Sequence, residues 1–319
     1  MQDNRYIVDV IIPTYKPDER IWKLLERLEK QTYMINKIII INTDESCIDT
    51  ARIAEMEKVE IHHIHLDEFD HGTSRNYGIT FSNADIVVFM TQDAVPENKY
   101  MIEELIRPFG DEEVYVTYGR QIPMQRCTFI EAYTRQFNYP DTDIVKTKDN
   151  IKSMGIKTYF SSDVCAAYRR ERQIELGGFP RTIFNEDSIF AAKVIQAGKK
   201  VYYTSKACVI HSHNYTYVQQ FNRNFDIGVS HKDFEEVFGT VKSEDEGIKL
   251  VKQTAKYLIS MGKWYLIPDM LIRSGFKFIG YVMGKQYKHL PKKMVLRCTS
   301  TKQYWTKKSW KETRQQPQK

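Results

Sequence analysis

The sequence predicts an α/β protein built on a mostly parallel sheet flanked by helices, with a small helical extension at its C-terminus. Short apolar runs of strand length alternate with segments of helical periodicity until about residue 211. Such alternation is typical of parallel strands joined by crossover helices. After about Gly239 the strand-like runs stop and helical segments rich in Lys, Trp and Tyr follow. We therefore expect a first domain over residues 1–238 and a basic helical extension over residues 239–319.

The first half of the chain carries the clearest alternation. The run Val8–Ile12 is stopped by Pro13 and is typical of a buried strand. Apolar residues then recur at helical spacing, which predicts a helix over residues 21–28 with one buried face. The alternation continues with strands expected at 37–41, 60–65 and 86–90 and helices at 49–56 and 75–81. Sheets of this kind bind ligands at the carboxyl ends of their strands, so polar residues that follow the strands are candidates for function.

The second half of the chain is less regular. A helix is expected at 97–108 and a strand at 114–118, but residues 119–157 are polar, aromatic and aperiodic, and their elements stay unassigned. Regularity returns with a strand at 164–169, a glycine-rich turn at 177–180, a helix at 187–197 and strand-like runs at 201–204 and 208–211.

The net charge of +6 is unevenly distributed. Residues 285–319 contain eleven Lys or Arg and one acidic residue, which leaves 36 basic and 40 acidic residues, a net charge of −4, for the first 284. This acidic balance argues against nucleic-acid binding, the non-enzymatic alternative that the basic tail raises. Five scattered cysteines without a CxxC pair fit reduced thiols rather than disulfides or structural zinc. With no signal-peptide pattern and no apolar run of about 18 residues, we expect a cytoplasmic protein, soluble or peripheral at the membrane.

Two groups of polar residues follow the first two strands. Pro13, Thr14 and Tyr15 end the first strand, and Asp44 begins an acidic loop, through Asp49, after the second. Acidic and hydroxyl groups at adjacent strand ends can bind the imide edge of a pyrimidine and a ribose. The alternative is ordinary turn chemistry, which also favours Asp and Ser.

A third group lies between the third strand and the next helix, and comprises Asp70, His71, Gly72, Arg75 and Asn76. Gly72 permits close backbone approach, and Ser74 could cap a helix that begins near Arg75. A cation in the first helical turn opposes the helix dipole unless an anion such as a diphosphate is bound nearby. The alternative is a capped helix with a solvated Arg.

The turn Thr91-Gln92-Asp93 follows the fourth strand. A carboxylate there, beside a diphosphate, can hold Mg²⁺ or Mn²⁺, which would neutralise charge on a departing diphosphate. His211 and His213 end a later strand, where they suit a metal or diphosphate role, although a single His is more often structural.

Asn185, Glu186 and Asp187 open the helix after the glycine-rich turn. A carboxylate at this position could act as a general base that takes the proton of an attacking hydroxyl group. The alternative is structural, since acidic residues at a helix N-terminus are favoured by the helix dipole.

Read in order, these groups resemble the inverting family-two glycosyltransferases, which have the GT-A fold, over roughly residues 6–230. The matching pieces are residues 10–15, the loop 44–49, the Asp-x-Asp-like turn and the Glu-Asp helix start. Within that family, residues 69–72 with Arg75 and Asn76, the turn 91–93 and residues 211–215 look most like bacterial rhamnosyltransferases. The resemblance implies a dTDP-L-rhamnose donor and a growing, usually lipid-linked, cell-surface polysaccharide as acceptor.

The resemblance also implies residue roles. Asp44 would hold the nucleotide base, Asp93 the metal ion with His211 as a second ligand, and Asp187 would be the general base. Glu186 is the alternative base if the register of that motif shifts by one. The remaining donor-binding set is Pro13, Thr14, Tyr15, Asp70, His71, Gly72, Arg75, Asn76 and Gln92, with Arg75 near the diphosphate. The chain departs from the family pattern in the Asp-x-Asp turn, which keeps only its last Asp with Gln92 in the middle position, and at Glu45 and Cys47 in the base-binding loop.

Two rival enzymatic interpretations remain. A sugar nucleotidyltransferase would carry a glycine-rich loop after the first strand, whereas residues 13–17 contain no glycine. Within the preferred class, the donor could be a UDP-sugar such as UDP-glucose, UDP-galactose or UDP-N-acetylglucosamine.

The C-terminal part suggests a partner rather than chemistry. Aromatic and apolar residues from Phe276 onward precede and interrupt the basic run. This mixture predicts contact with an anionic membrane surface through residues 276–319. The alternative is a solvated basic helix or a disordered end.

Overall fold

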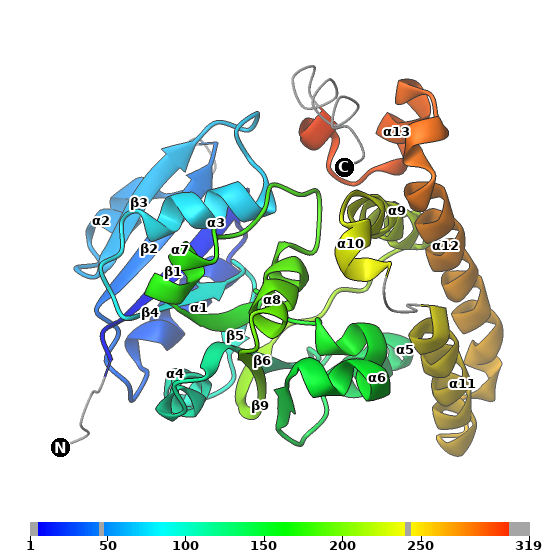
Figure 1. Ribbon diagram of the computed structural model, residues 1–319, viewed down its shortest axis with the longest axis horizontal. Helices are drawn as coiled ribbons and strands as arrows, with labels where there is room; N and C mark the ends of the chain where they lie inside the picture. Colours follow the sequence, from blue (N-terminus) through cyan, green and yellow to red (C-terminus); the bar gives the residue numbers. More distant parts are fainter. Residues whose placement is uncertain (1–5, 45–47, 240–243, 306–319) are drawn as a thin grey trace.

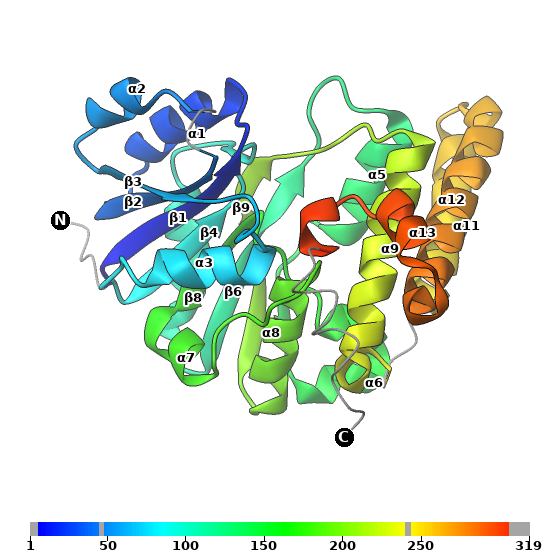
Figure 2. The same ribbon diagram turned by 90° about the horizontal axis from the view of Figure 1, so that it is seen from above.

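The computed structural model describes residues 6–44, 48–239 and 244–305 of the chain. Within these residues, nine strands form one sheet at the centre of the molecule, and helices cover both of its faces (Figures 1 and 2). In order across the sheet, the strands are β3 (Val59–Ile64), β2 (Lys37–Thr43), β1 (Val8–Tyr15), β4 (Ile86–Met90), β8 (Cys165–Arg169), β6 (Val114–Ile122), β9 (Lys200–Ile210) and β5 (Val95–Pro96), with β7 (Ile144–Lys146) paired to β9.

Strand direction determines which residues meet at one edge of the sheet. β3, β2, β1 and β4 run parallel, β8 is antiparallel to both β4 and β6, and β9 is parallel to β6. The carboxyl ends of β1, β2, β4, β6 and β9 therefore share an edge with the beginning of β8. Tyr15, Asp93 and His211, which end or follow such strands, and Asp163, which precedes β8, all belong to this edge.

Both faces of the sheet are buried, which explains the continuous apolar runs in the sequence. Val10 and Ile12 of β1 pack into one core with α1 (Arg20–Glu29) and α4 (Met101–Ile106). Ile11 points to the opposite face, where α3 (His71–Ile79) and α8 (Glu186–Gln196) contribute Ile79 and Phe190 to a second core. The alternation of one strand between two cores fixes its register, because a one-residue slip would exchange the two sets.

The C-terminal helices form a layer at the side of the molecule away from β3 (Figure 1). They are α9 (Tyr217–Asp233), α10 (Glu235–Phe238), α11 (Glu244–Ser260), α12 (Ile267–Lys285) and α13 (Lys292–Cys298). α9 and α12 approach so closely that a Cβ on Gly284 would lie 2.0 Å from the Phe225 carbonyl oxygen, and one on Gly280 would lie 2.3 Å from that of Phe221. The predicted domain boundary at residues 238/239 would assign α9 and α12 to different domains, although the two helices pack closely together. This boundary stays a prediction.

The predicted α/β fold class is confirmed, and the sheet is mixed because β5, β7 and β8 run antiparallel to their neighbours. The strand-like runs 201–204 and 208–211 correspond to one strand, β9, which ends at Ile210. The pairing register with β6 shifts at the residues between the two runs, where β9 bulges. Residues 119–157, left unassigned from the sequence, contain α5 (Phe129–Asn138), β7 and α6 (Ile151–Met154). In the part of the chain that the structure describes, no helix combines the length and apolarity needed to cross a bilayer.

The helix expected to begin near Arg75 with Ser74 as its cap begins one turn earlier, so both expectations were wrong. α3 starts at His71, and the Asp70 carboxylate caps it by accepting hydrogen bonds from the Gly72 and Thr73 amides, both at 2.9 Å. An Asp cap satisfies two of the otherwise unpaired amides at a helix start. Arg75 therefore lies in the second turn.

Candidate active site

A pocket of about 320 Å³ opens at the shared edge of the sheet, between the strand ends and the start of α8. Six predicted residues line it together, although they come from four separate segments of the chain: His71, Arg75, Asp93, Glu186, Asp187 and His211. The predicted nucleotide-binding residues at the ends of β1 and β2 lie on neighbouring strands outside this pocket, with Thr14 opposite Asn42 and Tyr15 opposite Thr43. Glu45, Ser46 and Cys47 fall outside the described residues.

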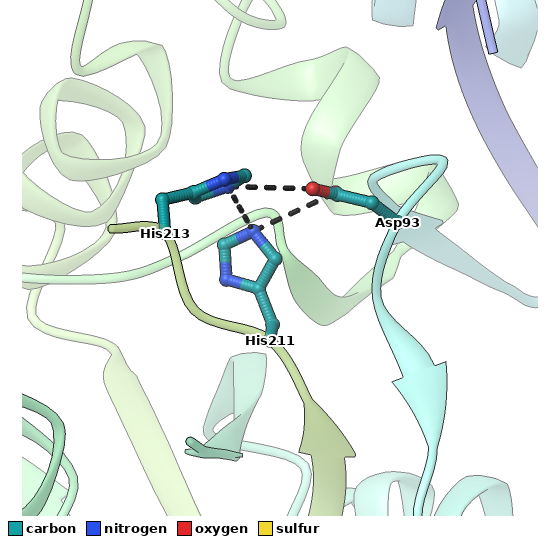
Figure 3. A group of neighbouring side chains, drawn as sticks. All are labelled: Asp93, His211 and His213. Carbon is teal, nitrogen blue, oxygen red and sulfur yellow. Dashed lines mark hydrogen bonds and ion pairs between the residues drawn. The ribbon is translucent and has the colours of Figure 1, made fainter. Parts of the chain in front are cut away.

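Asp93, His211 and His213 form a compact group at one wall of the pocket (Figure 3). The two histidine Nε2 atoms are 3.0 Å apart. Asp93 Oδ2 lies 3.3 Å from His213 Nε2, and Asp93 Oδ1 lies 3.5 Å from His211 Nε2. All three ligand atoms fall within 4.8 Å of one another, a spacing suited to a single metal ion.

Hydrogen bonds behind this group determine which nitrogen of His211 is free. Gln121 Nε2 donates to Tyr139 Oη at 2.6 Å and to Ser162 Oγ at 2.9 Å, which directs Gln121 Oε1 toward His211. That oxygen accepts from His211 Nδ1 at 2.9 Å. With its proton on Nδ1, His211 presents the lone pair of Nε2 to Asp93 and His213, as metal-binding histidines typically do.

This donor set fits a divalent cation, which would compete with the Arg20 guanidinium, 3.3 Å from Asp93 Oδ2, for the carboxylate. Burial, only partly opposed by the Asp93 carboxylate, lowers the pKa of His211 to about 3, so its imidazole is neutral at physiological pH. The lone pair of His211 Nε2 then faces Asp93 Oδ1, and His211 places no N–H group between them. Both atoms can therefore bind the same cation. Imidazole nitrogen and carboxylate oxygen are ligands that Mn²⁺ and Mg²⁺ sites accept, with oxygen preferred by the harder Mg²⁺.

A second group of charges in the wall of the pocket is centred on Arg75. The Arg75 guanidinium lies 2.9 Å from Glu186 Oε1 and 3.1 Å from Asp163 Oδ2, and it donates to the His71 carbonyl at 2.8 Å. Asp163 also accepts a hydrogen bond from Tyr168 at 2.6 Å. Because two carboxylates occupy the Arg75 guanidinium, this arrangement does not favour its expected place beside a diphosphate.

Asp187 differs from Glu186 in having no cation bound directly to it. Its carboxylate accepts backbone hydrogen bonds from Asp163, at 3.2 Å, and from Ser188, at 2.6 Å. Asn185 holds a left-handed backbone conformation (φ 66°) that turns the chain sharply into α8. Burial, and then repulsion from Glu186, raise the pKa of Asp187 to about 7. A carboxylate of this kind can take a proton near neutral pH.

Four of the predicted donor-binding residues have structural partners. Asp70 caps α3, and a Cβ at Gly72 would come within 2.2 Å of the Pro180 carbonyl oxygen, so Gly72 lets the 177–180 turn pack against the helix. The Asn76 side chain binds that turn through the backbone of Phe179, at 2.8 and 3.0 Å.

Gln92, the fourth, binds the backbone of Tyr15 with both ends of its amide, accepting at 2.8 Å and donating at 3.1 Å. It therefore ties the end of β1 to the turn that follows β4. His71 does line the pocket, and burial lowers its pKa to about 3, so it stays neutral.

Sequence reasoning missed several residues of the pocket. The Arg223 guanidinium from α9 lies between the rings of Phe184 and Tyr215, 4.8 and 4.9 Å from their centroids. No carboxylate partner for it occurs among the described residues. Asp163 and Gln121 were missed as well, because nothing in their local sequence distinguishes them from ordinary polar residues.

Comparison with known proteins places the chain in a family. Residues 9–176 match the model of glycosyl transferase family 2. The O-antigen chain rhamnosyltransferase WbaN of Salmonella anatum is 39% identical over 306 residues, covering 93% of this chain and 95% of the relative. The O-antigen chain rhamnosyltransferase RfbN of Salmonella typhimurium is 36% identical over 307 residues, covering 93% and 96%.

Solved structures agree on the fold. A mannosyltransferase from Pyrobaculum calidifontis, in complex with GDP-Man and Mn²⁺, has a TM-score of 0.55 at 16% identity and covers 98% of this chain and 88% of its own. Residues 1–349 of TarS from S. aureus, in complex with UDP, have a TM-score of 0.51 at 17% identity, covering 89% and 91%. The chain therefore belongs to glycosyl transferase family 2, which confirms the family, the GT-A fold and the inverting glycosyltransferase class predicted from the sequence.

Proposed function

We propose that this glycosyltransferase moves L-rhamnose from dTDP-L-rhamnose to a hydroxyl group of a lipid-linked polysaccharide precursor. Two curated relatives that match almost the whole chain are named O-antigen chain rhamnosyltransferases, which supports the sugar and the class of acceptor. The observation that carries the mechanism is one pocket that joins a group suited to a metal ion, Asp93, His211 and His213, to Asp187, whose carboxylate accepts only backbone hydrogen bonds.

The donor diphosphate belongs beside Asp93 in this proposal. Asp93, His211 and His213 would hold Mg²⁺ or Mn²⁺, and the ion would neutralise the charge that develops on the departing nucleotide diphosphate. Arg223 provides a second positive charge in the pocket, because its guanidinium has aromatic rings rather than a carboxylate as partners. Arg223 thus takes the diphosphate-binding role that the sequence assigned to Arg75.

Asp187 is the general base of the proposed reaction. The acceptor oxygen attacks the anomeric carbon opposite the leaving group, and its bond to that carbon forms as the bond to the phosphate oxygen breaks. Asp187 takes the hydroxyl proton, and the nucleotide diphosphate leaves with the electron pair of the broken bond. One displacement of this kind inverts the configuration at the anomeric carbon.

Glu186, the alternative base, is better suited to a supporting role. Its carboxylate is bound to Arg75 at 2.9 Å and is buried. Protonating Glu186 during the reaction would weaken this buried ion pair, and the loss of one partner of a buried pair is costly. Its negative charge instead helps to raise the pKa of Asp187.

A lipid-linked acceptor places the reaction at a membrane. We propose a cytoplasmic enzyme, peripheral on the inner face of the cell membrane, that meets anionic lipid through residues 276–319 and has no nucleic-acid partner. The support is the charge of this segment, in which Lys and Arg greatly outnumber acidic residues.

A donor screen tests the proposed sugar. The enzyme is incubated with a lipid-linked polysaccharide precursor as acceptor and with dTDP-rhamnose, UDP-glucose, UDP-galactose, UDP-N-acetylglucosamine or GDP-mannose, in the presence of Mg²⁺ or Mn²⁺, and release of the nucleoside diphosphate is measured. Of the five sugar nucleotides, we expect only dTDP-rhamnose to be turned over, and we expect the reaction to require the divalent cation. Turnover of a UDP-sugar at an equal or greater rate would refute the rhamnose assignment and leave the family intact.

A further inference from the structure

One face of the C-terminal helical layer carries large apolar side chains that nothing in the described part of the chain covers. Trp264 and Tyr265 lie in the short helix η5 (Trp264–Leu266), and Leu271, Ile272, Phe278 and Ile279 follow on α12. We call these six residues the α12 outer face. The exposed fraction is 67% for Trp264, 60% for Phe278 and 54% for Ile279. Contiguous exposure of this kind marks a contact surface.

The residues of α12 divide cleanly between two sides of the helix. Leu271 and Phe278 are seven residues apart and Ile272 and Ile279 likewise, so each pair returns to the same side after two turns. Met270, Gly280 and Gly284 lie on the opposite side and are buried, the two glycines against α9. The apolar outer face is therefore additional to the apolar surface that holds the helix on the protein.

The segment of the chain that carries this face is strongly basic. Residues 247–305 contain twelve Lys or Arg and a single acidic residue, Asp269, whose carboxylate binds Arg273 at 2.8 Å. Lys263 precedes the face and Lys285 ends α12. Trp and Tyr beside exposed Leu, Ile and Phe, with cations around them, are the composition of surfaces that lie in the headgroup region of a bilayer. The repulsion among so many cations disfavours pairing with a second copy of the same face.

We propose that the α12 outer face is the membrane anchor of the enzyme, inserting its apolar side chains into a bilayer whose anionic headgroups bind the surrounding lysines. This inference rests on the proposed transfer to a lipid-linked acceptor and names the surface that reaches the lipid. An anchor formed only by the basic tail would begin at Lys285. The six apolar residues of the α12 outer face all precede Lys285 in the chain. Among the residues predicted to face the membrane, Tyr281 and Met283 instead point inward, to His231 and to the core around Phe225.

The anchor has a fixed relation to the active site. α12 packs on α9 through backbone contacts at Gly228 and Gly284, and α9 carries Arg223 into the pocket. In Figure 2, α9 lies between α12 and the sheet. Docking by this surface would hold the pocket close to the bilayer, where a lipid-linked acceptor is confined.

Vesicle flotation of the full chain tests the anchor without any sugar substrate. The double variant Phe278→Ser/Ile279→Ser is compared with Met34→Ser/Ile174→Ser, which removes two apolar side chains of similar exposure, 62% and 50%, from the loop before β2 and from α7 (Arg170–Glu175). The vesicles are phosphatidylethanolamine with phosphatidylglycerol or pure phosphatidylcholine, at low and high NaCl. Binding of dTDP with Mn²⁺ reports that each variant keeps its folded pocket.

We expect the chain to bind the anionic vesicles, and we expect Phe278→Ser/Ile279→Ser to lower the partition coefficient by at least about tenfold while the control pair leaves it unchanged. High salt should weaken the binding but not abolish it, because the apolar part of the contact is not screened.

Equal binding by the two double variants would overturn the inference, as would complete loss of binding at high salt. The chain could instead fail to bind vesicles and sediment as a dimer that Phe278→Ser/Ile279→Ser converts to a monomer. That result would identify a second copy of the chain as the partner of this face, and it would also overturn the inference. Because the assay contains no sugar, its failure is distinct from failure of the donor screen.

Discussion

Substitution of Asp187 by Asn tests the proposed base with little change in shape. The amide keeps the size of the side chain but has no oxygen able to take a full proton. The carboxylate now accepts backbone hydrogen bonds from Asp163 and Ser188, and an amide can accept only one of them well. The lost bond costs about 1 kcal/mol of stability, and removal of a negative charge beside Glu186 offsets part of that cost.

The expected effect on catalysis is much larger than the effect on folding. A positioned general base contributes about 10²- to 10⁴-fold to the rate, equivalent to about 3 to 5 kcal/mol of activation free energy. We expect kcat to fall by that factor while the KM for the donor stays within about twofold. The measurement is release of dTDP from dTDP-rhamnose in the presence of acceptor. An Asp187→Asn variant that keeps a wild-type kcat would refute the assignment of the base.

Burial raises the pKa of Glu186 to about 7 as well, so the pH profiles of substituted enzymes, rather than the wild-type profile, separate it from Asp187. The base must be deprotonated, and the pKa of Asp187 is raised to about 7, so kcat/KM should rise as the pH increases through about 7 and then level off. Glu186→Gln removes the negative charge that helps to raise this pKa, so the rise should move to lower pH while transfer persists. If Glu186→Gln abolished transfer and Asp187→Asn left the pH profile intact, the two roles would be reversed.

Three further substitutions test the surroundings of the pocket. Gln121→Leu removes the acceptor that fixes the His211 tautomer, and we expect Mn²⁺ affinity in calorimetry to fall about 10- to 100-fold; unchanged affinity would disprove this role. Arg223→Ala should raise the KM for the donor by about tenfold or more, with partial recovery in Arg223→Lys, since one charge-assisted contact is worth about 1.5 to 3 kcal/mol; a donor KM that does not respond would exclude diphosphate contact. Gly284→Ala places a Cβ 2.0 Å from the Phe225 carbonyl and should destabilise the fold by about 1 to 3 kcal/mol in thermal unfolding, whereas Gly275→Ala, with open space around it, should be neutral or stabilising; equal melting temperatures would contradict the close packing of α9 and α12.

The sequence predicted the sheet well because local patterns carry that information. Val10–Ile12 and Ile38–Ile41 are continuous apolar runs, and both lie in strands buried on two faces. Asp93, Asp187 and His211 could be selected because they follow strands or open helices, and parallel topology gathers such positions at one edge. Helix starts were less certain, since either Ser74 or Asp70 could serve as a cap, and only the contact of Gly72 with Pro180 favours the longer helix.

The partners of the site residues could not be read from the chain. Arg75 was expected beside a diphosphate because its local context is a helix start near a glycine. Its actual partners, Asp163 and Glu186, lie about ninety to one hundred ten residues away in the sequence. The same holds for Gln121, whose hydrogen bond to His211 links two strands paired across the sheet. Such contacts depend on tertiary register rather than on local composition.

The most direct test of the account is a crystal structure of the chain with Mn²⁺ and dTDP, with the ion located by its anomalous scattering. The account predicts one Mn²⁺ bound by Asp93 together with His211 and His213, with the diphosphate on the side of Arg223 and the Asp187 carboxylate facing the remaining space of the pocket. An ion held elsewhere, or a diphosphate bound to Arg75 after the release of Asp163 and Glu186, would contradict it.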